Sequence, residues 1–296
     1  MNKKIYLCAV AALALASCSN DETVEVAKQS AISFRSVVGL NTRAVETTTG
    51  NLEAINVTAY KGMEAYFGVT APIKYEKNGT FFKSAQKYYW PVDDSELTFT
   101  ALSTNWTGTR AFTSSSDIKM TDVTIDKEVK NQADMIYVSG ATGKKSTNET
   151  SGLGLVMDHA LSQIQINAKN GNDLYKYQVK GIRIAKVNKK ATFNVIDGTW
   201  DNISDVETYD VTYDTPIDLT ADAKPLMEKN ATNNNLYENA MLIPQTTTAW
   251  DGTAIDDAVT GSYISVYLQI TTKDGGLVYP KKPGGFAWAS VPVSLG

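Results

Sequence analysis

The stretch Ile264-Ser265-Val266-Tyr267-Leu268-Gln269-Ile270-Thr271 alternates an aliphatic residue with a polar or aromatic one along its whole length. Successive side chains of a β-strand point to opposite faces of the sheet, so this period of two predicts a strand with one face in a core and one in water. The pattern recurs over residues 97–101 and 164–168, and in shorter form over 32–35. Threonine and tyrosine on the wetted face add β-propensity. We therefore expect an all-β fold.

Turn-forming pairs separate these runs, among them Asn78-Gly79, Asp197-Gly198 and Asp251-Gly252. They favour hairpins, because asparagine, aspartate and glycine tolerate positive φ. No window predicts a long amphipathic helix. Residues 224–239 come closest, but their asparagines weaken the pattern, so we expect one short helix or a loop there. Many short strands with regular turns are typical of β-sandwiches.

A domain boundary is expected near residues 140–152, the longest stretch after the N-terminal tether without apolar periodicity. It would divide the chain into an N-terminal β-sandwich, residues 44–150, and a C-terminal one, residues 151–296. Both pieces have a normal domain size. The alternative is a long loop within a single sandwich.

The N-terminus has the organisation of an export signal. A basic start at Lys3 and Lys4 precedes an apolar run over residues 5–16. This run is too short to span a hydrocarbon core of ~30 Å as a helix, and such segments are removed signals. The sequence Leu15-Ala16-Ser17-Cys18 resembles the bacterial lipobox, in which the cysteine is lipidated. We therefore expect a signal peptide over residues 1–17 and an outer-membrane lipid anchor on Cys18, the alternative being an ordinary secretory signal.

Residues 18–43 then form a lipidated tether with an N-terminal strand, and they are a candidate propeptide. The acidic residues Asp21 and Glu22 resemble a surface-export signal, or they belong to a merely polar tether. The two cysteines, Cys8 and Cys18, both lie in the signal region, so the folded part has no thiol for a disulfide or a metal site. The formal net charge is −4 and the lysines are scattered, which argues against nucleic acid as a partner.

Catalytic groups are sparse. The single histidine, His159, excludes sites that need two histidine ligands, and the chain has no Gly-x-Ser-x-Gly motif. We expect a structural role for His159, no enzyme activity, and neither cofactor nor metal. The tryptophans, with the run Tyr88-Tyr89-Trp90-Pro91, could form a sugar-stacking platform, but core packing is the commoner use of large aromatics.

A series of motifs along the chain resembles the fimbrillin-like family of the Bacteroidetes, which includes the subunits of type V pili. In order, these motifs are Ile32-Ser33-Phe34, Asn41-Thr42-Arg43-Ala44, Lys87-Tyr88-Tyr89-Trp90-Pro91, Leu97-Thr98-Phe99-Thr100-Ala101-Leu102, Asp134-Met135-Ile136-Tyr137, Asp158-His159-Ala160-Leu161-Ser162-Gln163-Ile164 and Met241-Leu242-Ile243-Pro244-Gln245. No single motif is very specific, but their order is. The resemblance covers nearly the whole chain.

This resemblance implies two tandem transthyretin-like β-sandwiches with Greek-key connections, assembled by donor-strand exchange. It also implies a protease cut between Arg43 and Ala44, which removes the lipid and opens a groove. Ile32 and Phe34 would fill that groove before the cut. In the alternative, Arg43 is an ordinary loop residue and the protein stays anchored. The family pattern usually continues beyond the position of Gly296, so either the chain is a fragment or its last strand is absent.

The expected function is a fimbrial subunit or related surface adhesin, with other pilin subunits as partners. The alternative is a surface glycan-binding lipoprotein of a polysaccharide-uptake system. The sequence identifies neither a receptor nor a glycan, and it does not separate stalk from tip or anchor subunits.

Overall fold

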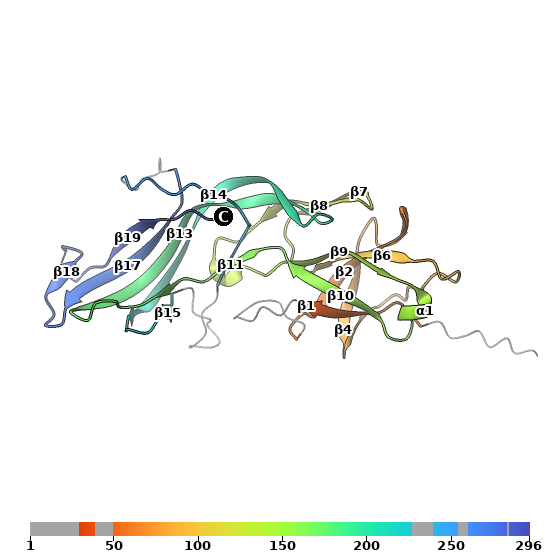
Figure 1. The fold of residues 1–296 in the computed structure, drawn as a ribbon, viewed down its shortest axis with the longest axis horizontal. Coiled ribbons are helices and arrows are strands. Elements are labelled where there is room, and N and C mark those ends of the chain that lie inside the picture. Colours follow the sequence, from red (N-terminus) through yellow and green to blue (C-terminus); the bar gives the residue numbers. More distant parts are fainter. Residues whose placement is uncertain (1–29, 39–49, 227–238, 254–259, 283) are drawn as a thin grey trace, which may run out of the picture.

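The computed structural model describes residues 30–38, 50–226, 239–253, 260–282 and 284–296. Within these ranges the regular structure is almost entirely β-strand (Figure 1). The exceptions are the short helix α1 (Lys145–Asn148) and the 3-10 turn η1 (Val129–Asn131). The expected all-β fold is confirmed. No helix in this part of the chain has the length and apolar character needed to cross a membrane.

The first sheet closes on itself. Its strands follow the order β3-β2-β4-β5-β1-β10-β9-β6, and β6 also pairs with β2. We call the closed circuit β2-β4-β5-β1-β10-β9-β6 the ring. Its strands and β3 are β1 (Phe34–Val38), β2 (Ala54–Lys61), β3 (Glu64–Phe67), β4 (Ile73–Asn78), β5 (Phe81–Ser84), β6 (Leu97–Ser103), β9 (Ile136–Gly143) and β10 (Leu153–His159). A closed ring satisfies the backbone groups that an open sheet edge would expose.

The second sheet has the order β18-β17-β13-β8-β7, with β14 also paired to β13 and β19 to β17. Its strands are β7 (Thr109–Ser114), β8 (Asp117–Thr124), β13 (Tyr175–Asn194), β14 (Thr199–Asp218), β17 (Tyr263–Thr272), β18 (Leu277–Tyr279) and β19 (Ala287–Pro292). Two short pairs lie apart from it, β11 (Ser162–Ile164) with β16 (Ala240–Leu242), and β12 (Asn167–Ala168) with β15 (Lys224–Pro225). β13 and β14 are 20 residues long each and join through the predicted turn at Gly198, whose N–H donates to the Asn194 carbonyl at 2.9 Å.

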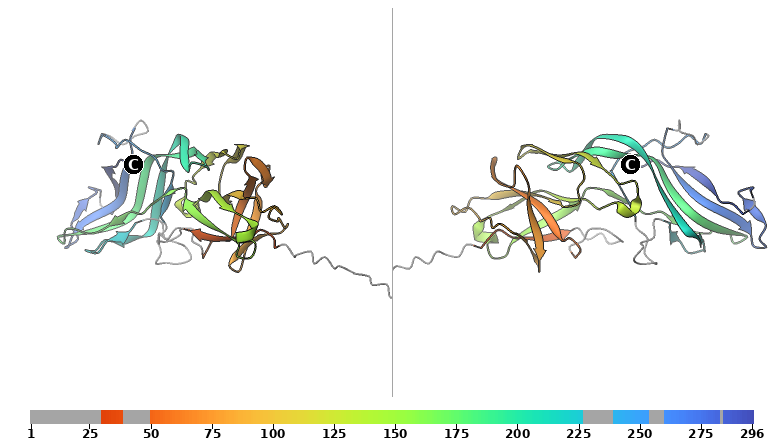
Figure 2. Two further views of the ribbon diagram at one scale, coloured as in Figure 1. Left: turned by 45° about the vertical axis from the view of Figure 1, so that its right-hand side comes forward. Right: turned by 180° about the vertical axis from the view of Figure 1, so that it is seen from behind.

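The two sheets do not divide the chain at residues 140–152. β8, which precedes that stretch, pairs with β13 of the second sheet, whereas β10, which follows it, pairs within the ring. Figure 2 shows the ring and the second sheet as two lobes, with the β7–β8 hairpin reaching from one to the other. The division into residues 44–150 and 151–296, and its transthyretin-like character, stay predictions.

Two large buried clusters form the cores. One fills the ring, and the other lies mainly under the second sheet. At their junction the buried Phe193 ring of β13 lies 4.9 Å from the ring of Tyr137, which belongs to β9. The rings of Trp106 and Trp200 are each 4.8 Å from Phe193. This aromatic contact ties the two lobes together.

The expected helix or loop over residues 224–239 is only partly described. Its first residues, Lys224–Pro225, form the strand β15, which pairs with β12. Residues 227–238 lie outside the described residues.

Candidate functional site: the slot of the N-terminal strand

β1 is the strand that closes the ring between β5 and β10. It pairs with β10 in parallel over five positions, from Phe34 opposite Leu153 to Val38 opposite Met157. With β5 it shares one antiparallel position, Phe34 opposite Phe82. We call the space that β1 fills between these two neighbours the slot. β1 is therefore held mainly from the β10 side.

Ile32 and Phe34, the two residues predicted for strand exchange, both point into the core of the ring. Ile32 is 1% exposed and Phe34 is fully buried at 0%. The Phe34 ring meets those of Tyr75 and Phe99 edge-on, at centroid distances of 4.8 and 5.1 Å. Edge-to-face pairs at this spacing are favourable beyond the area they bury. The structure thus brings both side chains into the ring core.

Backbone contacts fasten the residues that lead into β1. The Ile32 N–H donates to the Tyr88 carbonyl at 2.7 Å, and the Leu153 N–H donates to the Ser33 carbonyl at 3.0 Å. The Ser30 N–H donates to Glu149 Oε1 at 3.0 Å. Sequence reasoning missed Glu149, because nothing in a local pattern links it to Ser30.

Two buried polar atoms of β1 and the ring core have no hydrogen-bond partner among the described residues. They are the Ser36 hydroxyl of β1 and the Trp90 indole N–H. A buried polar group left unpaired costs about 1–3 kcal/mol. With β1 in place, the ring therefore keeps two unpaired polar groups, one of which belongs to β1.

Burial raises the pKa of the Tyr75 phenol well above its ordinary value. The unfolded phenol ionises near pH 10, so the stability linked to Tyr75 is fully present below about pH 10 and is lost as the pH rises above it. We expect Tyr75→Phe to weaken the alkaline loss of stability. Urea unfolding at pH 8, 10 and 11 measures this, with Tyr89→Phe, a more exposed tyrosine, as the control. An identical pH dependence in wild type and Tyr75→Phe would contradict it.

The remaining predicted site residues, Cys18, Arg43 and Ala44, lie outside the described residues. Lipidation at Cys18 and cleavage at Arg43 stay predictions. In the sequence, Arg43 follows the end of β1 at Val38 and precedes the rest of the ring, which resumes with β2.

His159 lies at the end of β10, where its Nδ1 is 2.8 Å from Asp134 Oδ2. The Asp134 side chain is almost fully buried, and its backbone carbonyl accepts a hydrogen bond from Asn105 Nδ2 at 2.8 Å. This places His159 in the packing between strands. Among the described residues no group of three or more histidine, cysteine or acidic side chains is arranged to hold a metal ion.

The tryptophans serve mainly as packing residues. Trp90 is buried in the ring, and Trp106 and Trp200 pack on the second core. Trp250 packs on Tyr263. Trp288 lies instead against the Arg183 guanidinium, 4.2 Å from its ring centroid. The five do not gather into one platform of the kind that stacks sugars.

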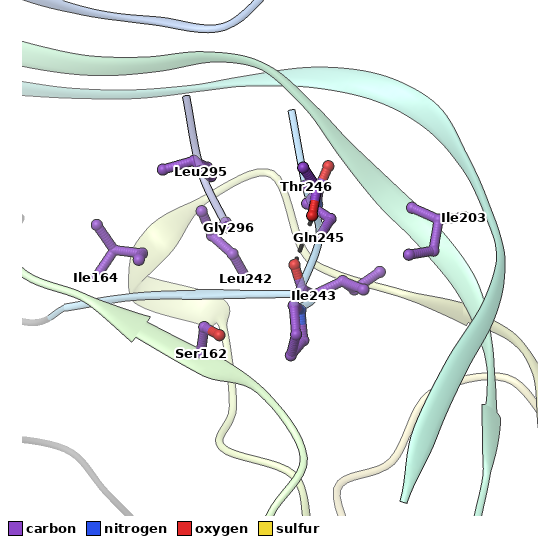
Figure 3. A pocket seen from close by; sticks show the side chains of 10 residues that line it. Ser162, Ile164, Ile203, Leu242, Ile243, Gln245, Thr246, Leu295 and Gly296 are labelled. Atoms are coloured by element: carbon purple, nitrogen blue, oxygen red, sulfur yellow. Dashed lines mark hydrogen bonds between the residues drawn. The ribbon is translucent and has the colours of Figure 1, made fainter. Parts of the chain in front are cut away.

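A further cavity of about 630 Å³ lies in the second lobe (Figure 3). Its walls are largely apolar and include Ile164, Ile203, Leu242 and Leu295. The Gln245 side chain beside it is engaged, because it accepts from the Asn188 N–H at 2.8 Å and donates to the Asn188 carbonyl at 2.9 Å. The described residues that line this cavity include no acid, base or cation.

The chain is similar to one protein family and to several solved structures. The family model described as fimbrillin-like matches residues 42–290. A fimbrial protein from Bacteroides vulgatus is similar in fold, with a TM-score of 0.56, 19% identity and 90% of each chain covered. A protein from Bacteroides uniformis assigned to cell adhesion gives a TM-score of 0.45 at 17% identity, covering 90% of this chain and 97% of that one. The fimbrial anchor protein Mfa2 from Porphyromonas gingivalis gives 0.32 at 12% identity, covering 84% and 80%.

No curated protein matches the sequence. The match to the family model nevertheless spans most of the chain and agrees with the all-β structure. The chain therefore belongs to the fimbrillin-like family.

Proposed function

We propose that the chain is a fimbrial subunit, exported as a lipoprotein on Cys18, which exchanges β1 for a strand of another subunit. One observation carries this proposal. The strand that closes the ring precedes Arg43, and the other ring strands follow it. A single cut after Arg43 would separate the closing strand from the rest of the ring, so that it could leave.

Loss of β1 would uncover the facing edges of β5 and β10 together with the core around Tyr75 and Phe99. Unpaired N–H and carbonyl groups on two edges, next to exposed apolar side chains, favour the uptake of another extended strand. If each subunit accepts a strand from the next, the contact is head-to-tail and does not close, so it generates a filament.

The free side of β19 in the second sheet is poorly suited to strand addition. The Val293 N–H donates to the Ser262 carbonyl at 3.1 Å, on the side of β19 that faces β17. Because backbone groups alternate along a strand, the N–H and carbonyl groups of residues 288, 290 and 292 point to the free side. The Trp288 carbonyl already accepts from the Tyr279 hydroxyl at 2.7 Å, and Pro292 has no N–H. This contrast supports exchange in the ring.

The partners under this proposal are other pilus subunits, and the location is the cell surface or the fimbrium. The family of fimbrial and adhesin proteins supports this level of description. If Arg43 is cut, the lipid on Cys18 delivers the subunit and is then lost. If it is not cut, the lipid stays as the anchor in the outer membrane.

Treatment of the lipid-free precursor with an arginine-specific protease tests this function. We expect one early cut after Arg43, followed by oligomers that resist sodium dodecyl sulfate. Arg43→Lys keeps the charge but removes the cleavage site, so it should give neither product. Mass spectrometry locates the cut and gel electrophoresis detects the oligomers. Cleavage at Arg43 without any oligomer would rule out the polymerising role.

A further inference from the structure

The pairing between β1 and β5, which we call the seam, is the shortest strand pairing in the ring. It has one register position, against five between β1 and β10. A cavity of about 400 Å³ opens at the seam. Ser30 and Ser33 line it from the β1 side, Lys83 and Lys87 from the β5 side, and Glu149 from the segment before β10.

Ser33 and Lys83 line the same cavity at the seam. They follow directly on the one register position that β1 and β5 share, Phe34 opposite Phe82. The Lys83 ammonium is exposed and lies 6.0 Å from the centroid of the Phe81 ring. β1 therefore presents a neutral hydroxyl to a cavity that Lys83 also lines.

The acids near the seam are already engaged. Glu76 stands across from Lys83 on β4, but its Oε1 is 2.7 Å from the Lys74 ammonium. Glu149 accepts the Ser30 N–H. Over the described ranges, neither Lys83 nor Lys87 forms an ion pair. Among the described residues, Lys83 and Lys87 thus share the seam with one carboxylate, that of Glu149, and neither lysine is paired with it.

The buried side of the slot is also incompletely matched. Among the described residues, the Ser36 hydroxyl of β1 and the Trp90 indole N–H of the ring core have no hydrogen-bond partner. β1 therefore brings one unpaired buried hydroxyl with it and forms no ion pair with the lysines of the seam. A strand without that hydroxyl and with an acid at the seam would match the slot better than β1 does.

We propose that the strand which replaces β1 carries an acidic side chain at the place of Ser33, beside Lys83 and Lys87. The occupant is an extended segment of another subunit, with large apolar residues at the places of Ile32 and Phe34 and aspartate or glutamate between them. Opposite charges on neighbouring strands stabilise the pair, and a positive patch speeds the approach of an acidic strand. This inference rests on the proposed function.

The charge preference of the slot is first measured in the full chain. Hydrogen exchange of the Leu153 amide reports the opening of β1, because this amide donates to the Ser33 carbonyl. We expect Ser33→Glu to exchange about three- to tenfold more slowly than Ser33→Lys at low salt, the contrast between an opposite-charge and a like-charge neighbour. High salt should reduce the difference.

Two double variants serve as controls. Lys83→Glu with Lys87→Glu should reverse the order of the two Ser33 variants. Lys281→Glu with Lys282→Glu makes the same change of charge at an exposed turn of the second sheet and should leave the order intact. Equal exchange in Ser33→Glu and Ser33→Lys would overturn the inference, whether or not the protein polymerises.

Capture of peptides then tests the link to strand exchange. Labelled peptides with the sequence of residues 30–38, and Arg35→Gln to resist cleavage, are added during treatment with the arginine-specific protease. The peptide with Ser33→Glu should be captured several-fold faster than the peptide with Ser33→Lys. Equal capture of both overturns the inference and leaves exchange intact. Cleavage without capture of any peptide overturns the exchange, while the full-chain result on charge preference stands.

Discussion

Phe34→Ala is expected to lower the free energy of unfolding by about 3–5 kcal/mol, the usual cost of truncating a fully buried phenylalanine. The loss has two parts, the burial of the ring and its edge-on contacts with Tyr75 and Phe99. Because Phe34 belongs to the strand that closes the ring, the substitution should also raise the population of chains in which β1 is detached. Chemical denaturation measures the first effect, and hydrogen exchange of the Leu153 amide measures the second.

Arg35→Ala provides the matched control, because Arg35 is the next residue of β1 and its side chain is exposed. Its effect should stay within about 0.5 kcal/mol, as for most surface substitutions. If Phe34→Ala cost no more than Arg35→Ala, Phe34 would not be a core residue, and the assignment of the slot would fail with it.

Phe193→Ala is expected to have an effect of similar size, about 3–5 kcal/mol, for a different reason. The Phe193 ring sits at the junction of the two lobes, in contact with Tyr137 of the ring and with Trp106 and Trp200. The β7–β8 hairpin also crosses from the ring side to pair with β13. Both features couple the two cores, so the whole protein should unfold in one transition at a lower denaturant concentration.

Two probes test this coupling. Hydrogen exchange of Leu153 follows the ring and that of Leu219, whose N–H donates to the Tyr177 carbonyl, follows the second sheet. Val206→Ala, on an exposed face of β14, is the control and should move neither probe appreciably. If Phe193→Ala destabilised only the second sheet, the two lobes would be independent folding units.

The alternating pattern predicts a strand well where the same face packs on the core along the whole strand. Residues 264–271 are such a case: they lie within β17, and one face of β17 packs on the core throughout. Residues 164–168 were expected to form one strand, and they do not. β11 pairs with β16 and β12 with β15, so the change of partner interrupts the ladder between them.

The closure of the ring could not be read from local patterns. Alternation identifies Ile32 and Phe34 as inward-facing, but not β5 and β10 as the neighbours of β1, since that choice depends on residues far along the chain. The lysines of the seam were missed for the same reason. In the sequence Lys83 is one exposed lysine among many, and only the fold brings it into one cavity with Ser33.

The unequal support of β1 has a mechanical consequence. If the lipid on Cys18 is kept as the anchor, as one form of the proposed function has it, flow would pull on the protein through Ser30 into β1. When that force acts along the strand, it loads the β1–β10 ladder in shear. The five paired positions then bear the force together, and their hydrogen bonds do not break one at a time. The side facing β5, with one shared position, carries little of the load. Under tension along the strand, the pairing with β10 therefore keeps β1 in place. A force across the strand would first separate β1 from β5 at the seam.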